Sequence, residues 1–500
     1  MSVNGKLGSE TLDGLNQFNT PVFDALRRYV REGAIPFHVP GHKQGKGMAG
    51  QFRDYLGAAV LELDVAEIPG IDGFYDQSGL IGRAQELAAA AFGADTTFFL
   101  VNGTSGGIQA MIMSVCGPGD KIIIPRNAHR SMVAGLIFSG AEPVYLQPAY
   151  DAKLGMTVGL TAGQVAAALE EHPDAKGVLV INPTYYGITS ELSGIAAIAH
   201  ARGVPLLVDE AHGPHLAFHP DLPQPALEAG ADIVVQSTHK ILSSLTQSSM
   251  LHIRDGLVNI DRTAAMLRLV QSTSASYLLL ASLDMARMQM ATAGEKLLTQ
   301  TLAAAGLARE RINRCAGLYS FGKEVIGRPG ICDTDPTKVT VNVSGLGLSG
   351  RQADRILRSD YGIQVELSDA VNVLAFFTIG DRREEAEKFA AALADLSRRI
   401  NKEGQHSTGP GTPPFPPIPR QIVSLREAFF ATPEPVPLSR SVGRISAGTV
   451  APYPPGIPLL CPGEEITGEA VDYLNAVLDL DIGVQGLHSA GDRTIRVIAG

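Results

Sequence analysis

Cysteine is scarce in this chain of 500 residues. The four cysteines lie far apart and form no pattern of metal ligands; they are Cys116, Cys315, Cys332 and Cys461. We therefore expect no metal site. So few cysteines in so long a chain are typical of a reducing compartment, which predicts a cytoplasmic protein.

Long apolar runs and an excess of positive charge are also missing. No stretch of about 18 or more apolar residues occurs, and residues 1–6 open no signal peptide, so we expect neither a membrane span nor a secretion signal. The chain carries 41 Lys and Arg against 51 Asp and Glu, which gives a net charge of −10. This balance argues against nucleic acid and anionic membranes as partners, and weakly favours cationic ligands.

What is present is a globular pattern. The apolar fraction of 45% suits a sizeable core, and the length allows several domains at about 150 residues each. From residue 83 onward, helical and strand patterns alternate, which predicts an α/β domain with a mainly parallel sheet. The predicted strands are 97–101, 121–125, 177–181, 204–208, 233–235 and, after a hairpin, 248–254. The predicted helices are 20–32, 83–92, 103–116, 161–171, 192–202 and 261–316, the last interrupted at 271–276.

The chain changes character after about residue 330. Strands at 337–343 and 364–367 with helices at 349–359 and 383–400 indicate a smaller α+β domain. Residues 401–420 hold six Pro and three Gly, which is typical of a linker. We therefore divide the chain into an N-terminal segment 1–60, a large domain 61–330, a small α+β domain 331–400, the linker 401–420 and a C-terminal α+β domain 421–500.

Lys240 is the first candidate for chemistry. It follows the apolar strand 233–235, and ligands of α/β proteins bind where such strands end. Ile241 and Leu242 come next, so the amine has partly apolar surroundings and loses some preference for its protonated form. A deprotonated lysine can form a Schiff base with an aldehyde. A lysine at a strand end, taken alone, is more often a surface residue.

Other strand ends carry further polar groups. Asp209 follows strand 204–208, where a carboxylate is costly unless it meets a cation or strong donors. His129 follows strand 121–125. Thr104 and Ser105 open a helix after strand 97–101, where free backbone N–H groups and the positive helix end bind anions. Each of these residues alone has an ordinary alternative, such as a helix cap, an exposed histidine or a flexible turn.

Together these groups match the needs of pyridoxal 5′-phosphate. Its phosphate needs hydroxyl and N–H donors, its ring a stacking partner, its pyridine nitrogen a carboxylate and its aldehyde a lysine. The order of anion site, ring stacker, Asp and Lys resembles the aspartate-aminotransferase type of fold, known as fold type I. The sequence therefore predicts a large domain that binds this cofactor.

Four segments make the resemblance more specific. Residues 37–43, 102–105, 237–240 and 452–458 resemble the bacterial ornithine/lysine/arginine decarboxylase family, from about residue 18 to the end of the chain. The chain looks like a short form without the N-terminal receiver-like domain of larger members. The resemblance implies decarboxylation of a basic amino acid in polyamine metabolism, with arginine, which gives agmatine and carbon dioxide, favoured over lysine or ornithine.

The resemblance also implies roles for single residues. Lys240 is the Schiff-base lysine, Asp209 pairs with the pyridine nitrogen and His129 stacks on the ring, and these three are the expected catalytic residues. The residues expected to contact the cofactor are Gly103, Thr104, Ser105, His129, Asp209, Ala211, His212, Ser237, His239, Lys240 and Thr273. Larger members have an aromatic residue in place of His212. Residues 272–274 resemble a segment that reaches the neighbouring subunit's phosphate, so we expect a homodimer or higher homo-oligomer with shared active sites.

Some questions stay open on the sequence alone. The dense polar segment 37–47 favours a binding role over a plain surface loop. Glu464 and Glu465 are candidates for the substrate's distal cation, although surface carboxylates are the more common explanation. A fold-related aminotransferase would use the same Lys240 and Asp209. A non-catalytic regulator on a decarboxylase scaffold is the other alternative, and the intact lysine and aspartate argue against it.

Overall fold

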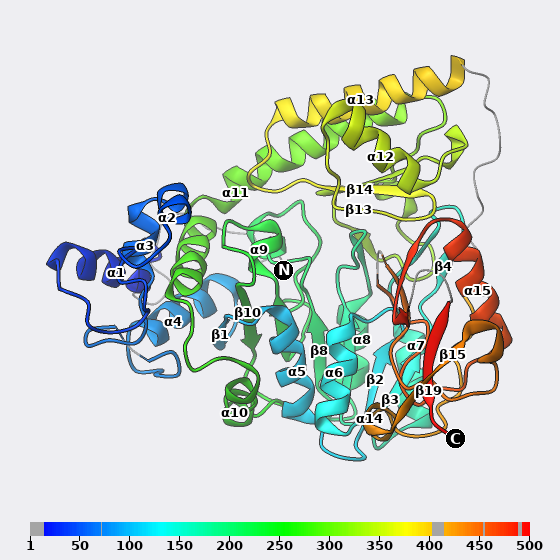
Figure 1. Ribbon diagram of the computed structural model, residues 1–500, viewed down its shortest axis with the longest axis horizontal. Helices are drawn as coiled ribbons and strands as arrows, with labels where there is room; N and C mark the ends of the chain where they lie inside the picture. The colour runs from blue at the N-terminus through cyan, green and yellow to red at the C-terminus, as the bar shows by residue number, and fades with distance from the viewer. Residues whose placement is uncertain (1–14, 72, 403–414, 454–455, 489–492) are drawn as a thin grey trace, which may run out of the picture.

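A central sheet organises the computed structural model, which describes residues 15–71, 73–402, 415–453, 456–488 and 493–500. Its seven strands lie in the order β1-β10-β9-β8-β6-β2-β3 (Figure 1). They are β1 (Thr96–Leu100), β2 (Lys121–Pro125), β3 (Glu142–Leu146), β6 (Gly177–Ile181), β8 (Leu206–Asp209), β9 (Ile233–Gln236) and β10 (Ser249–Ile253). β10 is antiparallel to both its neighbours, and the other pairs are parallel. The predicted α/β fold with a mainly parallel sheet is confirmed.

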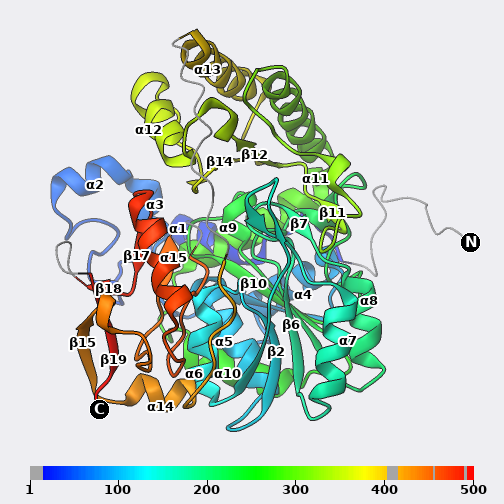
Figure 2. The ribbon, with the colours of Figure 1, turned by 90° about the vertical axis from the view of Figure 1, so that its right-hand side faces the viewer.

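Helices cover both faces of this sheet. Ile122 and Ile124 of β2 belong to the core that includes α5 and α6, whereas Ile123 belongs to the core that includes α7 and α8. Figure 2 shows these two pairs on opposite sides of the sheet. Strands buried on both faces are apolar along their length, which explains the continuous apolar runs in the sequence. The four helices are α5 (Gly103–Val115), α6 (Arg130–Ser139), α7 (Ala162–Glu171) and α8 (Leu192–His200).

The N-terminal helices pack against a long helix that leads to the next domain. α11 is 37 residues long, and the segment 271–276 separates it from α10, as predicted. No helix of the described ranges is both long and apolar enough to cross a membrane. The helices of this region are α1 (Pro21–Glu32), α2 (Gly50–Leu56), α3 (Ala58–Leu63), α4 (Leu80–Phe92), α9 (Thr238–Ile241), α10 (Ile260–Val270) and α11 (Tyr277–Asn313).

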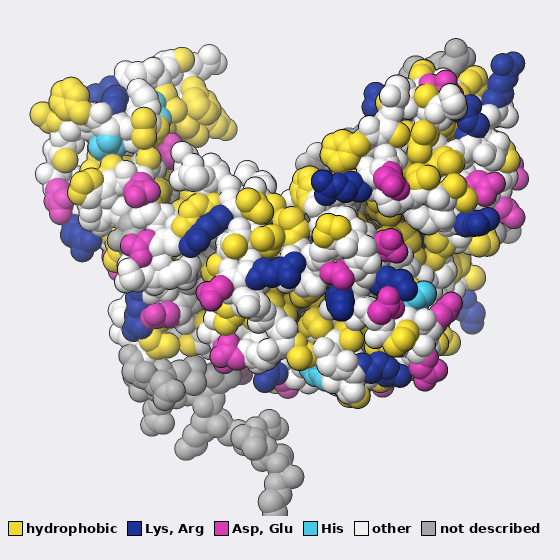
Figure 3. All heavy atoms as spheres, turned by 90° about the horizontal axis from the view of Figure 1, so that it is seen from below, with side chains coloured by type: hydrophobic (Ala, Val, Ile, Leu, Met, Phe, Trp, Pro, Cys, Tyr) yellow, Lys and Arg dark blue, Asp and Glu magenta, His cyan; other side chains and the backbone are white. Residues whose placement is uncertain are grey.

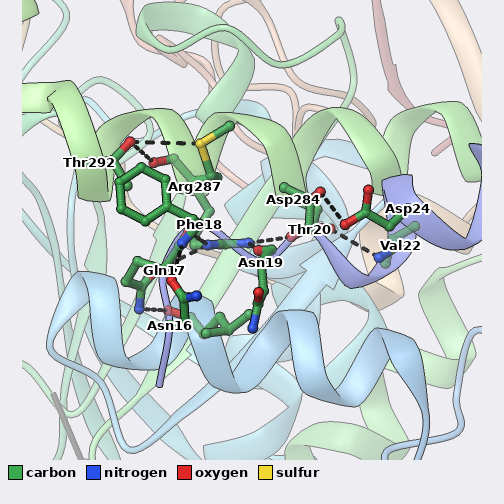
Figure 4. Close-up of polar contacts among 12 residues, drawn as sticks. Asn16, Gln17, Phe18, Asn19, Thr20, Val22, Asp24, Asp284, Arg287 and Thr292 are labelled. Atoms are coloured by element: carbon green, nitrogen blue, oxygen red, sulfur yellow. Dashed lines mark hydrogen bonds and ion pairs between the residues drawn. The ribbon is translucent and has the colours of Figure 1, made fainter. Parts of the chain in front are cut away.

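A buried ion pair on α11 holds the N-terminal segment in place (Figure 4). The Arg287 guanidinium contacts Asp284 at 2.5 Å and donates to the backbone carbonyls of Gln17 and Asn19, each at 2.6 Å. Asp284 in turn accepts from the Val22 N–H at 3.0 Å, at the start of α1. Both charged side chains are fully buried, so each one depends on the other for its stability in the interior.

The small domain contains a three-stranded sheet in the order β12-β14-β13. The predicted strand 364–367 is displaced, because β13 covers only Leu367 and Ser368 and shares a single residue with it. β14 was not predicted: Asn372 interrupts its apolar pattern, and a turn held by the Asp369 carboxylate directs the chain back as its central strand. The elements are β12 (Lys338–Asn342), α12 (Gly350–Tyr361), β13 (Leu367–Ser368), β14 (Asn372–Phe376) and α13 (Arg383–Lys402).

The C-terminal part has a core of its own, centred on Leu460, Leu474 and Val497. Its elements are α14 (Leu425–Phe430), β15 (Pro433–Pro437), β16 (Ala451–Tyr453), α15 (Gly468–Asp479), β17 (Gly483–Gln485), β18 (Leu487–His488) and β19 (Thr494–Ile498). Most of the predicted linker 401–420 lies outside the described residues. Short strands elsewhere are β4 (Tyr150–Asp151), β5 (Met156–Thr157), β7 (Ile188–Thr189) and β11 (Asp333–Thr334).

The strand β3 was also missing from the sequence prediction. Its second residue is Pro143, and proline argues against a central strand because it cannot donate a hydrogen bond. β3 lies at the edge of the sheet and pairs only with β2. An edge position tolerates the proline, and this position is fixed by the tertiary fold.

The Arg287 pair predicts a stability effect. Arg287→Met keeps most of the buried volume but leaves Asp284 charged without its partner, and should lower the free energy of unfolding by about 3–5 kcal/mol. The readout is the thermal midpoint or urea midpoint of unfolding. As a matched control, Arg314→Met removes the exposed partner of Glu310 next to the same helix and should change stability by less than about 1 kcal/mol. Equal effects of the two substitutions would contradict this account of the pair.

Candidate active site

A cleft lies at the carboxyl ends of the parallel strands, the edge where open α/β sheets bind ligands. The cleft has an empty volume of about 1230 Å³ and is open to solvent. Asp209 ends β8, Lys240 lies just after β9, and His129 lies just after β2. The loops after these strands bring residues that are far apart in the sequence to the same cleft.

Lys240 lies on α9, with its amine between polar and aromatic groups. Its Nζ is 3.0 Å from Nε2 of His212 and 5.6 Å from the centre of the Tyr185 ring. Burial lowers the pKa of Lys240, while the negative charge of Asp209 opposes this by stabilising the ammonium form. A partly desolvated amine of this kind is available as a nucleophile closer to neutral pH.

Asp209 is almost fully buried, at 4% exposure. Burial raises the pKa of Asp209 to about 6, and the charge of Lys240 and the Ala211 N–H counteract the rise. The Ala211 N–H donates to Oδ1 at 3.1 Å. The carboxylate is therefore mostly ionised at pH 7, and its Oδ1 is already engaged.

His129 caps the first turn of α6. Its Nδ1 accepts a hydrogen bond from the Ser131 N–H at 3.2 Å and lies 2.8 Å from the Ser131 hydroxyl. The ring is exposed to the cleft, but the walls limit its hydration, so desolvation, together with Lys240 and Arg130, lowers the pKa of His129. A neutral ring with its proton on Nε2 is the form that keeps the cap, and the ring is thereby held in one orientation.

Three hydroxyls meet at the amino end of α5. Thr104 Oγ1 lies 3.1 Å from Ser249 Oγ and is also hydrogen-bonded to Ser237 Oγ. Gly103 precedes this cluster with a φ of +65°, a left-handed conformation that favours glycine, and its N–H donates to the Gln247 carbonyl at 2.9 Å. Hydroxyl donors and the positive end of a helix at one place make an anion site.

Two further histidines belong to the same cleft. His239 Nδ1 is 2.8 Å from the Ser248 carbonyl, which requires a proton on that nitrogen. The His212 ring lies against Tyr185, with ring centres 4.3 Å apart. Burial lowers the pKa of His212 well below the usual range. Among the described residues, its Nδ1 has no hydrogen-bond partner.

The structure brings most of the predicted site residues together. Those that line the cleft are Gly103, Thr104, Ser105, His129, Asp209, Ala211, His212, Ser237, His239 and Lys240. Thr273 does not line it: this residue lies in the exposed segment between α10 and α11. Its predicted contact is with the phosphate of the neighbouring subunit, so the role of Thr273 stays a prediction.

Sequence reasoning missed several residues of the cleft. Tyr185 and Tyr186 follow β6, and the strand-end rule that indicated Asp209 could have indicated them as well. Tyr453, Gly456 and Ile457 belong to the segment 452–458, whose Pro454 and Pro455 lie outside the described residues. The same strand-end rule covers Asn127 and Ala128 after β2 and Ile181 and Thr184 at the end of β6. No sequence signal marks Ile108 and Thr157, which also line the cleft.

The expectation for Glu464 needs correction. Its side chain is fully buried and forms a two-pronged ion pair with Arg126, at 2.5 and 2.7 Å. Arg126 also donates to the carbonyls of Pro458 and Leu459. Glu464 is therefore neither a surface carboxylate nor free for a substrate cation, because a buried guanidinium already occupies it.

The segment 37–47 lies away from this cleft. Tyr29 OH is 2.7 Å from His38 Nε2, and Lys43 donates to the His38 carbonyl. His42 Nε2 lies 3.1 Å from the Asp64 carboxylate. None of these side chains lines the described cleft of its own chain, so the predicted binding role stays a prediction.

Comparison with known proteins defines the class. The model of the Orn/Lys/Arg decarboxylase major domain matches residues 20–385, and that of the Orn/Lys/Arg decarboxylase C-terminal domain matches residues 423–489. The chain belongs to this decarboxylase family. Arginine decarboxylases of Bacillus anthracis and Bacillus subtilis are each 46% identical to it; these matches cover 97% of this chain and 98% and 99% of theirs.

Solved structures agree with the fold. The Francisella novicida lysine decarboxylase LdcF superposes with a TM-score of 0.83 at 22% identity, covering 96% of this chain and 81% of its own. The constitutive lysine decarboxylase of Escherichia coli gives a TM-score of 0.82 at 22% identity, covering 97% of this chain and 82% of its own. At these identities the likeness concerns the fold.

The electrostatics of the cleft predict how Lys240 reacts. In protein freed of bound small molecules, trinitrobenzenesulfonate should label Lys240 at a lower pH than exposed lysines, because burial favours its neutral amine. Asp209→Asn removes a charge that stabilises the ammonium, so its labelling midpoint should fall further. Peptide mass spectrometry across pH measures both midpoints. The exposed Glu228→Gln serves as the control, and an upward shift in Asp209→Asn would refute the assigned interaction.

Proposed function

We propose that this protein is a pyridoxal 5′-phosphate-dependent decarboxylase that converts arginine to agmatine and carbon dioxide, with lysine and ornithine as weaker candidates. The observation that carries the substrate is the 46% identity, over nearly the whole chain, to relatives named arginine decarboxylase. The Lys240–Asp209 pair on the cleft supports the chemistry. The amine product would serve polyamine metabolism in the cytoplasm.

The donor set of the cleft fits the cofactor. The hydroxyls of Thr104 and Ser237 at the amino end of α5 would hold a phosphate. Asp209 offers Oδ2 to a protonated ring nitrogen, since Oδ1 accepts from Ala211. His129 offers the face of a fixed, neutral ring, and Lys240 offers the amine that would bind the aldehyde carbon. When bound, the cofactor supplies an electron sink for the bond that breaks at Cα.

The remaining tasks fall to side chains of this chain. Asp209, ionised and excluded from water, would keep a proton on the ring nitrogen. The Lys240 amine would be released as substrate amine binds, and it would then be positioned to carry a proton. His212 Nε2 lies 3.0 Å from that amine. Burial, with the charge of Lys240, keeps the pKa of His212 well below its usual range, so the ring would stay neutral and orient the amine by accepting a hydrogen bond from it.

Identification of products tests the proposal. Protein reconstituted with pyridoxal 5′-phosphate and incubated with arginine should release agmatine and carbon dioxide in equal amounts. An aminotransferase would instead form a keto acid and need an acceptor, and a regulator would form neither. Borohydride should fix the cofactor on Lys240, as read by peptide mass spectrometry. Fixation on another lysine, or no carbon dioxide from arginine, lysine or ornithine, would contradict the proposal.

We further propose that the protein is a homodimer at least. Large apolar side chains of the N-terminal part are exposed in the single chain: Phe37 at 91%, Tyr55 at 90% and Ile35 at 78%. In Figure 3, hydrophobic side chains gather on the raised part at the left, beside a hollow. Its place in Figure 1 shows that this part is made by the N-terminal helices. Apolar side chains that are exposed together are typical of an interface.

Thr273 supports shared active sites. It is exposed and lies outside the cleft of its own chain, and the family resemblance assigns its segment to the phosphate of the neighbouring subunit. A contact across the dimer is consistent with both points.

Complementation tests the shared site. Lys240→Ala and the double variant Thr273→Ala/Ser274→Ala should each be folded and strongly impaired. After subunit exchange, a mixed dimer holds one site with both defects and one with neither, so activity should approach about half of the wild-type value per mixed dimer. Activity no higher than that of either parent, despite exchange proven by mass spectrometry of tagged chains, would exclude sharing through Thr273.

A further inference from the structure

Most carboxylates around the cleft are already engaged. Asp209 is buried and accepts a hydrogen bond from the Ala211 N–H. Glu210 accepts from the Ala226 N–H at 2.8 Å and from Gln236 Nε2 at 2.7 Å. Glu464 is paired with Arg126. None of these three is available to a cation that enters from solvent.

The carboxylates behind the cleft are engaged as well. Asp335 is buried between Lys338 at 3.0 Å and His215 at 3.1 Å. Asp369 accepts from the Tyr186 hydroxyl at 2.6 Å and from backbone N–H groups of the turn before β14. Both side chains have their hydrogen-bonding capacity used by the fold.

Glu366 differs from all of these. It is exposed just before β13 and accepts a hydrogen bond from the hydroxyl of Tyr185, a residue of the cleft wall. Within the described part of the chain, no lysine or arginine forms an ion pair with Glu366. Tyr453 lines both the cleft and the neighbouring hollow that contains Glu366. A carboxylate that is exposed and forms no ion pair thus lies at the edge of the cleft, although Arg351, Arg355 and Arg358 line the same hollow.

We propose that Glu366 receives the distal cation of the substrate and so selects basic amino acids. This inference rests on the proposed decarboxylase function and adds its specificity-determining residue. The ligand group is a guanidinium or an ammonium at the end of an aliphatic chain, which a carboxylate binds through charge-assisted hydrogen bonds.

The Tyr185 ring lies between the Lys240 amine and Glu366 and so sets the length of substrate that can join them. The Lys240 amine lies 5.6 Å from the centre of the Tyr185 ring on one side, and Glu366 is hydrogen-bonded to the hydroxyl of the same ring. A substrate whose α-amino end is at Lys240 can therefore lay its methylene groups along this ring and reach Glu366 with its far end. His212 and Phe376 hold the ring in place, with centre distances of 4.3 and 5.8 Å.

The field of Glu366 extends to the reacting amine. Its negative charge opposes the desolvation that lowers the pKa of Lys240, so the two groups lie within electrostatic range. A substrate cation at Glu366 would neutralise this field. Substrate binding and the state of the Lys240 amine would then be coupled through one carboxylate.

The test compares Glu366→Gln with wild-type protein. The substitution removes the charge and keeps the shape, so the KM for arginine should rise about 10- to 100-fold, the value of a charge-assisted hydrogen bond, with a smaller change in kcat. Calorimetry with agmatine, which keeps the cation and needs no turnover, should show the same loss of affinity. Citrulline, whose urea group is neutral, should bind both proteins equally weakly.

Asp354→Asn is the matched control. Asp354 lines the same hollow as Glu366 and accepts from the Ser368 hydroxyl at 3.1 Å, so its loss changes the charge at the mouth without touching Tyr185. Its KM should stay within a factor of about two of wild type. Equal effects of the two variants, or agmatine affinity unchanged in Glu366→Gln, would overturn the cation site.

The two proposals can fail separately. A wild-type protein that decarboxylates arginine while Glu366→Gln keeps a normal KM refutes the cation site alone. A protein that releases no carbon dioxide but binds agmatine in a Glu366-dependent manner refutes the decarboxylase function and retains the site. Absence of both turnover and agmatine binding refutes both.

Discussion

The ion pair of Arg126 and Glu464 connects the two sides of the candidate active site. Arg126 comes directly after β2 and precedes the loop that carries His129, and its guanidinium also binds the Pro458 carbonyl. Both charges are withdrawn from water, so either one alone would be strongly destabilising. The end of β2 is therefore tied to the C-terminal segment that brings Ile457 to the cleft. The pair can form only when the C-terminal part is docked against the large sheet. The docked part in turn holds this wall of the cleft in position.

Within the cleft, burial and charge act in opposite directions on the same two groups. Desolvation lowers the pKa of Lys240 and raises the pKa of Asp209, while the attraction between their charges counteracts both shifts. The amine is thus made reactive without the carboxylate losing its charge at neutral pH. A surface lysine would stay protonated, and an isolated buried aspartate would become neutral. The two groups can stabilise each other's charge because the parallel strands β8 and β9 are neighbours and end at the same edge of the sheet.

Sequence patterns predicted the parts of this structure that depend on local chemistry. Continuous apolar runs indicated most of the parallel strands, and the polar residues after them indicated Asp209, His129 and Lys240, because the carboxyl ends of parallel strands share an edge. The pattern failed where the tertiary fold decides. Pro143 is tolerated only because β3 lies at the sheet edge, and β14 follows a turn that the buried Asp369 stabilises. The burial of Glu464 depends on Arg126, 338 residues away, which no local pattern encodes.

Glu366 likewise could not be identified from the sequence, because its role depends on a tertiary contact. An exposed glutamate before a short strand has no distinguishing pattern, and its significance arises only from Tyr185, which belongs to another domain. The large sheet supplies the amine and the carboxylate, whereas the small domain supplies the charge at the mouth. Parts that lie on separate elements can vary independently. Residues of the small domain could therefore change which cation is selected while Lys240 and Asp209 remain as the fold places them, and this arrangement suits a family whose named members act on different basic amino acids.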